Sequence, residues 1–105
     1  MSKSESHKRL QVKAAGKDGK TEVKLKNSNK RLDAITKTGK TATEVERSGT
    51  SSGLEKAAQR LKIIRSKIKV LQVPQKDMSQ AVKAMKTKKV KGSVKNMSGT
   101  KRRST

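Results

Sequence analysis

The spacing of apolar residues predicts three short strands in the first half of the chain. Val23 and Leu25 alternate with polar residues, and so do Leu32 and Ala34 in the next segment. Alternation of this kind places apolar side chains on one face of a strand. Polar turns separate the segments, and Gly39 is free to adopt positive φ in the second turn. The pattern therefore predicts an antiparallel meander with strands over residues 21–26, 31–36 and 41–47 and turns over 27–29 and 37–40.

In the second half of the chain the apolar spacing becomes helical over residues 54–65, with repeats at i, i+3, i+4 and i+7. The apolar run KIKVLQVP, which ends at Pro74, predicts a buried strand. Helical spacing returns over residues 75–89, where Asp77 is placed to cap the N-terminus of the helix. The pattern thus predicts a helix, a strand and a second helix after the meander.

Together these elements predict an α/β fold with a small mixed four-stranded sheet in α-β-β-β-α-β-α order. The first helix is expected over residues 4–15, and Gly16 would end it. A strand that returns to the sheet after a helix implies a right-handed crossover. Residues 88–105 are rich in Lys, Arg, Gly and Ser and contain no acidic residue. We therefore expect one domain over residues 1–87 and a flexible, disordered basic tail over 88–105.

The chain is strongly basic, since 29 Lys and Arg against 8 Asp and Glu give a net charge of +21 in 105 residues. Self-repulsion at this charge opposes a compact state, so we expect a polyanionic partner, with nucleic acid the first candidate. The absence of Phe, Trp and Tyr excludes aromatic platforms for base stacking. The absence of Cys excludes disulfides, thiolate nucleophiles and zinc-finger sites. His7, the single histidine, lies in a polar segment and is interpreted as solvated.

No apolar run in the chain approaches the roughly 18–20 residues that a membrane-spanning helix needs. The first residues also lack the apolar region of a signal peptide. We therefore expect no membrane span, no signal peptide of the chain's own, and a cytoplasmic site of action.

Three of the acidic residues, Asp33, Glu44 and Glu46, lie in the most strand-like segment. Side chains alternate along a strand, so Glu44 and Glu46 share one face, and Asp33 on the neighbouring strand is expected to join them. At neutral pH such a cluster favours a hard cation, Mg²⁺ or Mn²⁺, with water and phosphate oxygens as further ligands. The alternative is that these acids pair with Lys and Arg on a solvated sheet face, where each pair contributes about 0.2–1 kcal/mol.

The order α-β-β-β-α-β, with RLDAI on the second strand and TEVER on the third, resembles the core of the PD-(D/E)XK nucleases, which have the restriction-endonuclease-like fold. The resemblance covers residues 5–87 and implies that Asp33 and Glu44 bind Mg²⁺. The family usually has Lys where this chain has Glu46. The resemblance therefore leaves Glu46 either as a further metal contact or as the general base for the attacking water.

The resemblance also extends to the helix after the third strand. In some members this helix supplies the motif lysine, and Lys56 is the candidate here. Gln59 and Arg60, one turn later, would then bind substrate or orient the site. The catalytic residues implied by the resemblance are Asp33, Glu44, Glu46 and Lys56.

The function expected from these features is Mg²⁺-dependent endonuclease cleavage of DNA or RNA. The resemblance extends to bacterial toxin nuclease domains, which implies an acidic immunity or inhibitor protein as a partner; a house-keeping or phage nuclease is the other setting. The alternative is a non-enzymatic basic nucleic-acid-binding protein, ribosome-associated or DNA-compacting, which the charge favours. A membrane-active cationic peptide is disfavoured, because no helix combines a wide apolar face with bulky anchoring residues. The residues expected to bind nucleic acid are Gln59, Arg60, Lys62, Arg65, Lys101, Arg102 and Arg103.

Overall fold

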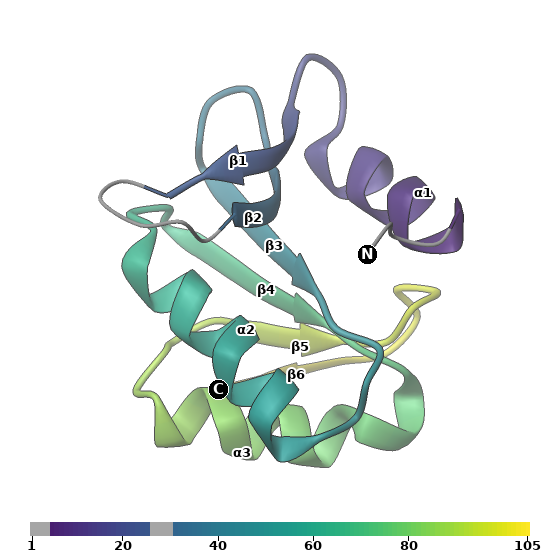
Figure 1. The fold of residues 1–105 in the computed structure, drawn as a ribbon, viewed down its shortest axis with the longest axis vertical. Helices are drawn as coiled ribbons and strands as arrows, with labels where there is room; N and C mark the ends of the chain where they lie inside the picture. Colours follow the sequence, from purple (N-terminus) through teal and green to yellow (C-terminus); the bar gives the residue numbers. More distant parts are fainter. Residues whose placement is uncertain (1–4, 26–30) are drawn as a thin grey trace.

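The structure, a computed structural model, describes residues 5–25 and 31–105. These residues form one mixed six-stranded sheet in the order β1-β2-β3-β4-β5-β6, with helices packed against it (Figure 1). The helices are α1 (Glu5–Ala15), α2 (Ser51–Ile63) and α3 (Met78–Thr87), and a short 3-10 turn, η1 (Gln75–Asp77), precedes α3. The strands are β1 (Lys20–Lys24), β2 (Arg31–Ile35), β3 (Thr41–Val45), β4 (Ile68–Gln72), β5 (Ser93–Lys95) and β6 (Arg102–Ser104).

The sheet combines antiparallel and parallel strand pairs. β1, β2 and β3 form an antiparallel meander, β3, β4 and β5 run parallel to one another, and β6 returns antiparallel to β5. The predicted mixed α/β sheet is confirmed, but the predicted number of four strands is wrong, because β5 and β6 extend the sheet to six. Gly39 has φ +74° in the turn between β2 and β3, as expected. The turn expected over 27–29 lies outside the described residues.

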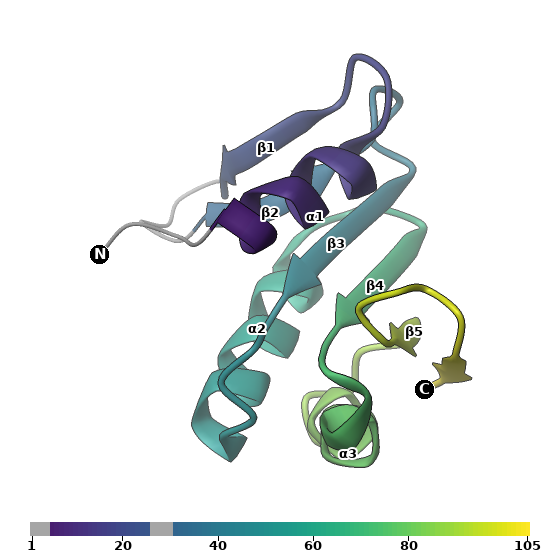
Figure 2. The same cartoon turned by 90° about the vertical axis from the view of Figure 1, so that its right-hand side faces the viewer.

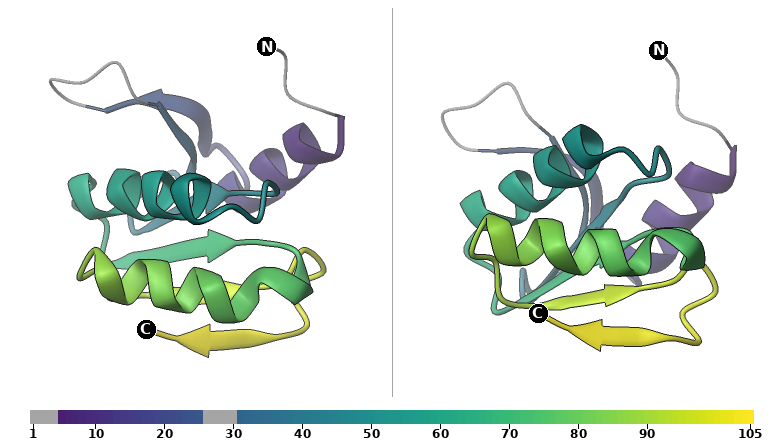
Figure 3. Two further views of the ribbon diagram at one scale, coloured as in Figure 1. Left: turned by 60° about the horizontal axis from the view of Figure 1, so that its bottom comes forward. Right: turned by 90° about the horizontal axis from the view of Figure 1, so that it is seen from below.

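The two faces of the sheet are covered by different helices. Helices α2 and α3 contact each other and lie side by side on one face (Figure 3). Helix α1 packs against β1, β2 and β3 on the other face, away from α3 (Figure 2). Residues along β3 show this division. Ala42 belongs to the core beneath α2 and α3, whereas Thr41 and Thr43 line a hollow together with residues of α1.

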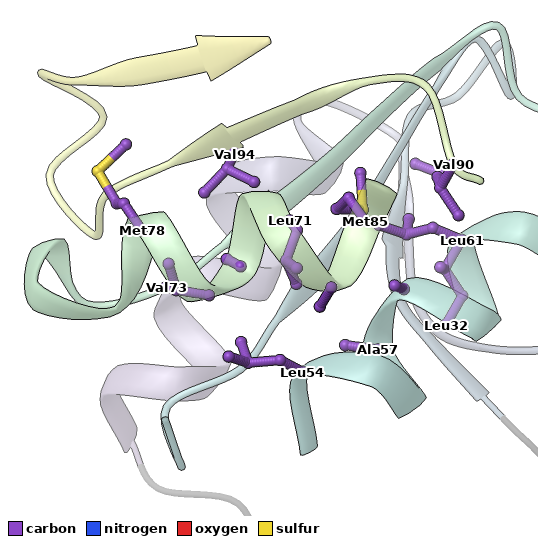
Figure 4. Packing of buried hydrophobic residues seen from close by; sticks show 14 of the residues in the cluster. Leu32, Leu54, Ala57, Leu61, Leu71, Val73, Met78, Met85, Val90 and Val94 are labelled. Atoms are coloured by element: carbon purple, nitrogen blue, oxygen red, sulfur yellow. The ribbon is translucent and has the colours of Figure 1, made fainter. Parts of the chain in front are cut away.

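The hydrophobic core lies between the sheet and the α2–α3 pair. Leu54 and Leu61 of α2 and Met85 of α3 are buried in one cluster with Leu71 of β4 (Figure 4). Burial of each such aliphatic side chain stabilises the fold by about 1.5–3 kcal/mol, so a core without aromatic residues is sufficient only if it is well filled. The α1 face of the sheet is more polar, and the sheet therefore has one apolar face and one face suited to polar contacts.

Residues 88–105 form β5 and β6 instead of the predicted flexible tail. Val90 and Val94 are 3% and 0% exposed and belong to the core. The loop between the two strands is held by Asn96, whose side chain donates to Thr100 Oγ1 at 3.0 Å. Local sequence could not reveal β5, because it has three residues between polar neighbours and forms by pairing with β4.

The starts of α2 and α3 also differ from the sequence expectation. α2 begins at Ser51, three residues before its first apolar position, because Thr50 Oγ1 accepts a hydrogen bond from the Gly53 N–H at 3.0 Å. Asp77 occupies the N-cap position of α3 but makes no side-chain capping bond, so its predicted capping role is wrong. Among the described residues, no helix has both the length and the apolar composition needed to cross a membrane.

Candidate active site

β1 and β2 are irregular at Glu22 and Asp33, which would face each other in a regular ladder. The pairing continues on both sides of these two residues but skips them. Glu22 has φ +53°, a conformation that residues other than glycine rarely adopt. On β2, Leu32 belongs to the core and Ile35 packs against it, although strict alternation would send them to opposite faces. The irregularity thus lets Asp33 turn toward α1.

Asp33 is 3% exposed, and its carboxylate lies between α1 and the backbone of β3. Its Oδ1 accepts a hydrogen bond from Gln11 Nε2 at 3.0 Å and lies 3.3 Å from His7 Nε2. Its Oδ2 accepts the N–H of Val45 at 2.8 Å. Gln11 Nε2 also donates to the carbonyl of Asp33 at 3.2 Å. Helix α1 therefore sets the orientation of this carboxylate.

Glu44, on β3, faces α2 and is 1% exposed. Its Oε1 accepts the N–H of Asp33 at 3.0 Å, and its Oε2 lies 3.4 Å from Arg60 Nη1. The carboxylate of Asp33 thus binds the backbone of β3, and the carboxylate of Glu44 binds the backbone of β2. The two side chains occupy the gap where the β2–β3 pairing ends, and we call them the acidic pair.

The acidic pair has an unfavourable charge arrangement. Burial, and then repulsion from Asp33, raise the pKa of Glu44 well above its ordinary value of 4.5. The Arg60 guanidinium and the backbone N–H of Asp33 act in the opposite direction and offset this only in part. Desolvation and a like charge both disfavour the ionised form of a carboxyl group. The ionised form of Glu44 is therefore disfavoured beside Asp33.

The predicted cluster of three acids on one sheet face is only partly present. Asp33 contacts α1, whereas Glu44 faces α2. The prediction that Asp33 shares a sheet face with Glu44 is therefore wrong, but the Glu44 carboxylate still reaches Asp33 through its backbone N–H. The alternative of a solvated face is also wrong for this pair, because both side chains are buried. Glu46 is half-buried after β3, and its Oε1 accepts the N–H of Ser48 at 3.0 Å. In the part of the chain that the structure describes, no three Asp, Glu or His side chains converge as a metal-binding group.

Arg60, rather than Lys56, is the α2 residue in contact with the acidic pair. Lys56 is exposed and lines a shallow hollow with Gln59 and with Lys88, which follows α3. Arg60 lies one turn later with its side chain 30% exposed, and its Nε is buried without a hydrogen-bond partner. A buried donor without a partner is costly, so Arg60 has an unused donor beside Glu44.

The other predicted nucleic-acid-binding residues lie on separate surfaces. Lys62 and Arg65 are exposed at the end of α2 and just beyond it. Arg102 lines the hollow beneath α1, whereas Arg103 donates to a serine hydroxyl of α3 at 3.2 Å. Lys101 is exposed immediately before β6. The structure therefore distributes these cations over both sides of the sheet.

The sequence pattern missed two residues beside Asp33, namely His7 and Gln11. The interpretation of His7 as solvated is wrong, because its side chain is 15% exposed and lies 3.3 Å from Asp33 Oδ1. Gln11 is 3% exposed. The two residues are four positions apart on α1 and so share one side of the helix. This i, i+4 polar pair is the signal that could have located them.

The donor set of the acidic pair fits a hard divalent cation. Mg²⁺ and Mn²⁺ bind carboxylate oxygens, and Asp33 and Glu44 would hold the ion. These oxygens already have protein partners: Asp33 Oδ1 contacts Gln11 and His7, Asp33 Oδ2 accepts the N–H of Val45, and the Glu44 oxygens contact the Asp33 N–H and Arg60. A bound ion would share the carboxylate oxygens with these partners. A cation would also offset the repulsion that raises the pKa of Glu44.

No protein-family model matches this chain, and comparisons with curated proteins and with solved structures found no significant match. The class of protein is therefore judged from features of the chain itself, namely a small mixed α/β sheet, a buried acidic pair and a net charge of +21.

Proposed function

We propose that the protein is a metal-dependent nuclease that cleaves phosphodiester bonds of DNA or RNA. The observation that carries the proposal is that the buried carboxylates of Asp33 and Glu44 each accept a backbone N–H from the other's strand where β2 and β3 separate, and that the two acids interact electrostatically. Two buried like charges cost stability, and the Arg60 guanidinium offsets this cost only in part, so a structural role alone is a poor explanation. An acid on the second strand and another on the third, in α-β-β-β-α-β order, also support the resemblance to PD-(D/E)XK nucleases.

Each residue around the acidic pair has a task in this proposal. Asp33 and Glu44 hold Mg²⁺ or Mn²⁺, which when bound activates a water molecule and stabilises the charge that develops on the phosphodiester. Gln11 fixes the orientation of the Asp33 carboxylate from α1. Arg60 lies beside Glu44 with its side chain 30% exposed, and the exposed part of its guanidinium binds a phosphate oxygen of the substrate.

The proposed general base lies outside the acidic pair. The resemblance leaves Glu46 as a further metal contact or as the general base, and Lys56 as the substitute for the family's motif lysine. Glu46 is favoured, since the i+2 spacing directs its side chain to the same side of the chain as Glu44. Lys56 is exposed on α2, and its proposed role is to bind a phosphate of the substrate.

The test is cleavage of supercoiled plasmid and of tRNA by the purified protein, with Mg²⁺ or with EDTA. We expect Mg²⁺-dependent cleavage that Asp33→Asn and Glu44→Gln each lower by about a hundredfold or more, the scale seen when a group that stabilises transition-state charge is removed. Glu55→Gln makes the same carboxylate-to-amide change on α2, away from the acidic pair, and serves as the matched control. Cleavage that persists in EDTA, or in both pair variants, would contradict the proposal.

Non-enzymatic binding of nucleic acid is the second candidate, and the net charge of +21 is the observation that favours it. In that case Mg²⁺ produces no cleavage, and Asp33→Asn leaves binding unchanged or tightens it by removing a negative charge. A mobility-shift titration in EDTA, run beside the cleavage assay, separates the two functions.

A further inference from the structure

A hollow of about 340 Å³ lies on the α1 face of the sheet, separate from the hydrophobic core. Its walls come from α1, β3, β4 and the hairpin of β5 and β6, which are far apart in the sequence. Thr43 and Gln72 provide polar groups beside Val70 at its base. The hollow is therefore a solvent-open concavity with polar side chains in its lining.

Three cations from three different elements line this hollow: Lys13 of α1, Lys95 of β5 and Arg102 of β6. Lys95 and Arg102 are direct cross-strand partners, an arrangement in which like charges destabilise a sheet. Burial, and then repulsion from Arg102 and Lys13, lower the pKa of Lys95. No Asp or Glu is among the described residues that line the hollow. The cluster thus has an excess of positive charge that the described side chains around it do not neutralise.

The wall that carries two of these cations is held in place by buried hydrogen bonds. Gln72 Nε2 donates to the carbonyls of Asn96 at 3.1 Å and of Met97 at 3.0 Å, which ties the β5–β6 loop to β4. The Asn96 side chain accepts the N–H of Lys101 at 3.1 Å at the other end of the loop. Because this network fixes the hairpin, the cationic cluster is preorganised and does not have to be assembled by a ligand.

We propose that this hollow binds a phosphate group of a nucleic-acid backbone. Lys13, Lys95 and Arg102 neutralise the phosphate, and the Thr43 and Gln72 side chains line the floor beneath it. Bound phosphate also relieves the repulsion between Lys95 and Arg102. A nucleic acid suits the site better than a membrane surface, because the cations line a hollow that a single phosphate can enter and do not form a flat exposed face.

In the proposed nuclease, the hollow helps to position the nucleic-acid substrate. This role in positioning rests on the proposed nuclease function. Helix α1 borders both sites, since Gln11 holds Asp33 while Lys13 lines the hollow. A backbone seated in the hollow would therefore pass along the same helix that orients the acidic pair. Binding itself does not require cleavage, so the two proposals can be tested apart.

The test measures binding of fluorescein-labelled duplex DNA and single-stranded RNA by anisotropy, in EDTA and at several salt concentrations. We expect Lys95→Gln with Arg102→Gln to weaken duplex binding about tenfold or more and to lower the slope of log K against log salt by about one unit per cation removed. Lys13→Gln, on an exposed helix position outside the sheet pairing, should give about half of that change in slope. The matched control is Lys83→Gln with Lys86→Gln on α3, which removes the same charge from the opposite face.

Thermal unfolding without nucleic acid provides a second readout. Removal of the Lys95–Arg102 repulsion should leave the double variant as stable as the wild type or more stable, so a loss of binding cannot be attributed to unfolding. Equal effects of the hollow variants and the α3 control on affinity and salt slope would overturn the proposal. It would also be overturned if inorganic phosphate, or vesicles of phosphatidylserine and phosphatidylcholine, bound through these residues while nucleic-acid affinity stayed unchanged.

The outcomes also distinguish this proposal from the nuclease proposal. Cleavage with Mg²⁺ by a protein whose hollow variants bind normally would refute the phosphate site and leave the nuclease proposal standing. Nucleic-acid binding through the hollow without cleavage would refute the nuclease proposal and leave the phosphate site standing.

Discussion

At the scale of single residues, burial moves the pKa of Glu44 away from that of an exposed glutamate. Its carboxyl group is 1% exposed, and burial and Asp33 both raise its pKa. A carboxyl group whose pKa is raised in the folded state stabilises the fold at pH values below its unfolded pKa. This contribution is lost as the pH rises through the raised pKa. The ionisable groups around Glu44 are Asp33, Arg60 and, through Asp33, His7.

The acidic pair therefore predicts a pH-dependent stability of the metal-free protein. We expect the wild type to lose stability as the pH rises from about 4.5 toward neutrality, and Glu44→Gln to flatten this dependence and to be the more stable protein at neutral pH. Thermal unfolding in EDTA over this range is the measurement. Glu55→Gln is the control for a carboxyl group on α2. A Glu44→Gln profile parallel to that of the wild type would show that Glu44 is not the responsible group.

Part of the candidate site is predictable from the sequence. Asp33 and Glu44 are predicted because acidic residues are rare in this chain and because strand alternation places them near each other. The direction of Asp33 was not predictable, because the irregularity opposite Glu22 changes which face it takes. The resemblance predicts that Arg60 binds substrate or orients the site, but its contact with Glu44 depends on how α2 packs across β3.

At the scale of elements, the first turn of α2 depends on a polar contact that apolar periodicity does not register. The apolar pattern begins at Leu54, whereas the helix begins at Ser51 because Thr50 satisfies a free N–H of the first turn. Asp77 has an equally suitable side chain before α3 but makes no such bond. The side chain that caps a helix is thus decided by local geometry as well as by residue type.

This difference predicts the effect of removing the Thr50 hydroxyl. We expect Thr50→Ala to lower the free energy of unfolding by about 1 kcal/mol, since the Gly53 N–H loses its partner. Thr50→Ser keeps the hydroxyl and should retain most of the stability. Urea unfolding followed by circular dichroism gives the comparison. Equal stability of the Ala and Ser variants would contradict the capping role.

At the scale of the whole molecule, the basic C-terminal segment is part of the domain. β5 and β6 extend the sheet, and Val90 and Val94 fill the core beneath α3. Burial of two valine side chains contributes about 3–6 kcal/mol, a large share of the 5–15 kcal/mol by which small domains are stable. The hairpin also supplies two of the three cations of the hollow.

Removal of residues 88–105 is therefore expected to abolish cooperative unfolding. A shorter deletion of residues 102–105 removes β6 but keeps Val90 and Val94, and it should leave a folded but less stable protein. Differential scanning calorimetry of the two deletions and the wild type is the measurement. A wild-type unfolding transition in the protein without residues 88–105 would restore the interpretation of this segment as a dispensable tail.

The sequence by itself determined the glycine stop signal of α1, the periodicities that define α2, α3 and β1 to β4, the dominance of positive charge, and the presence of acids on two neighbouring strands. These are local properties, since periodicity and charge belong to residues close together in the chain. Only the tertiary structure decided that residues 88–105 complete the sheet, that Asp33 and Glu44 meet from opposite faces, and that Lys13, Lys95 and Arg102 share one hollow. Each of these depends on contacts between segments distant in the sequence, where packing and strand pairing outweigh local preference.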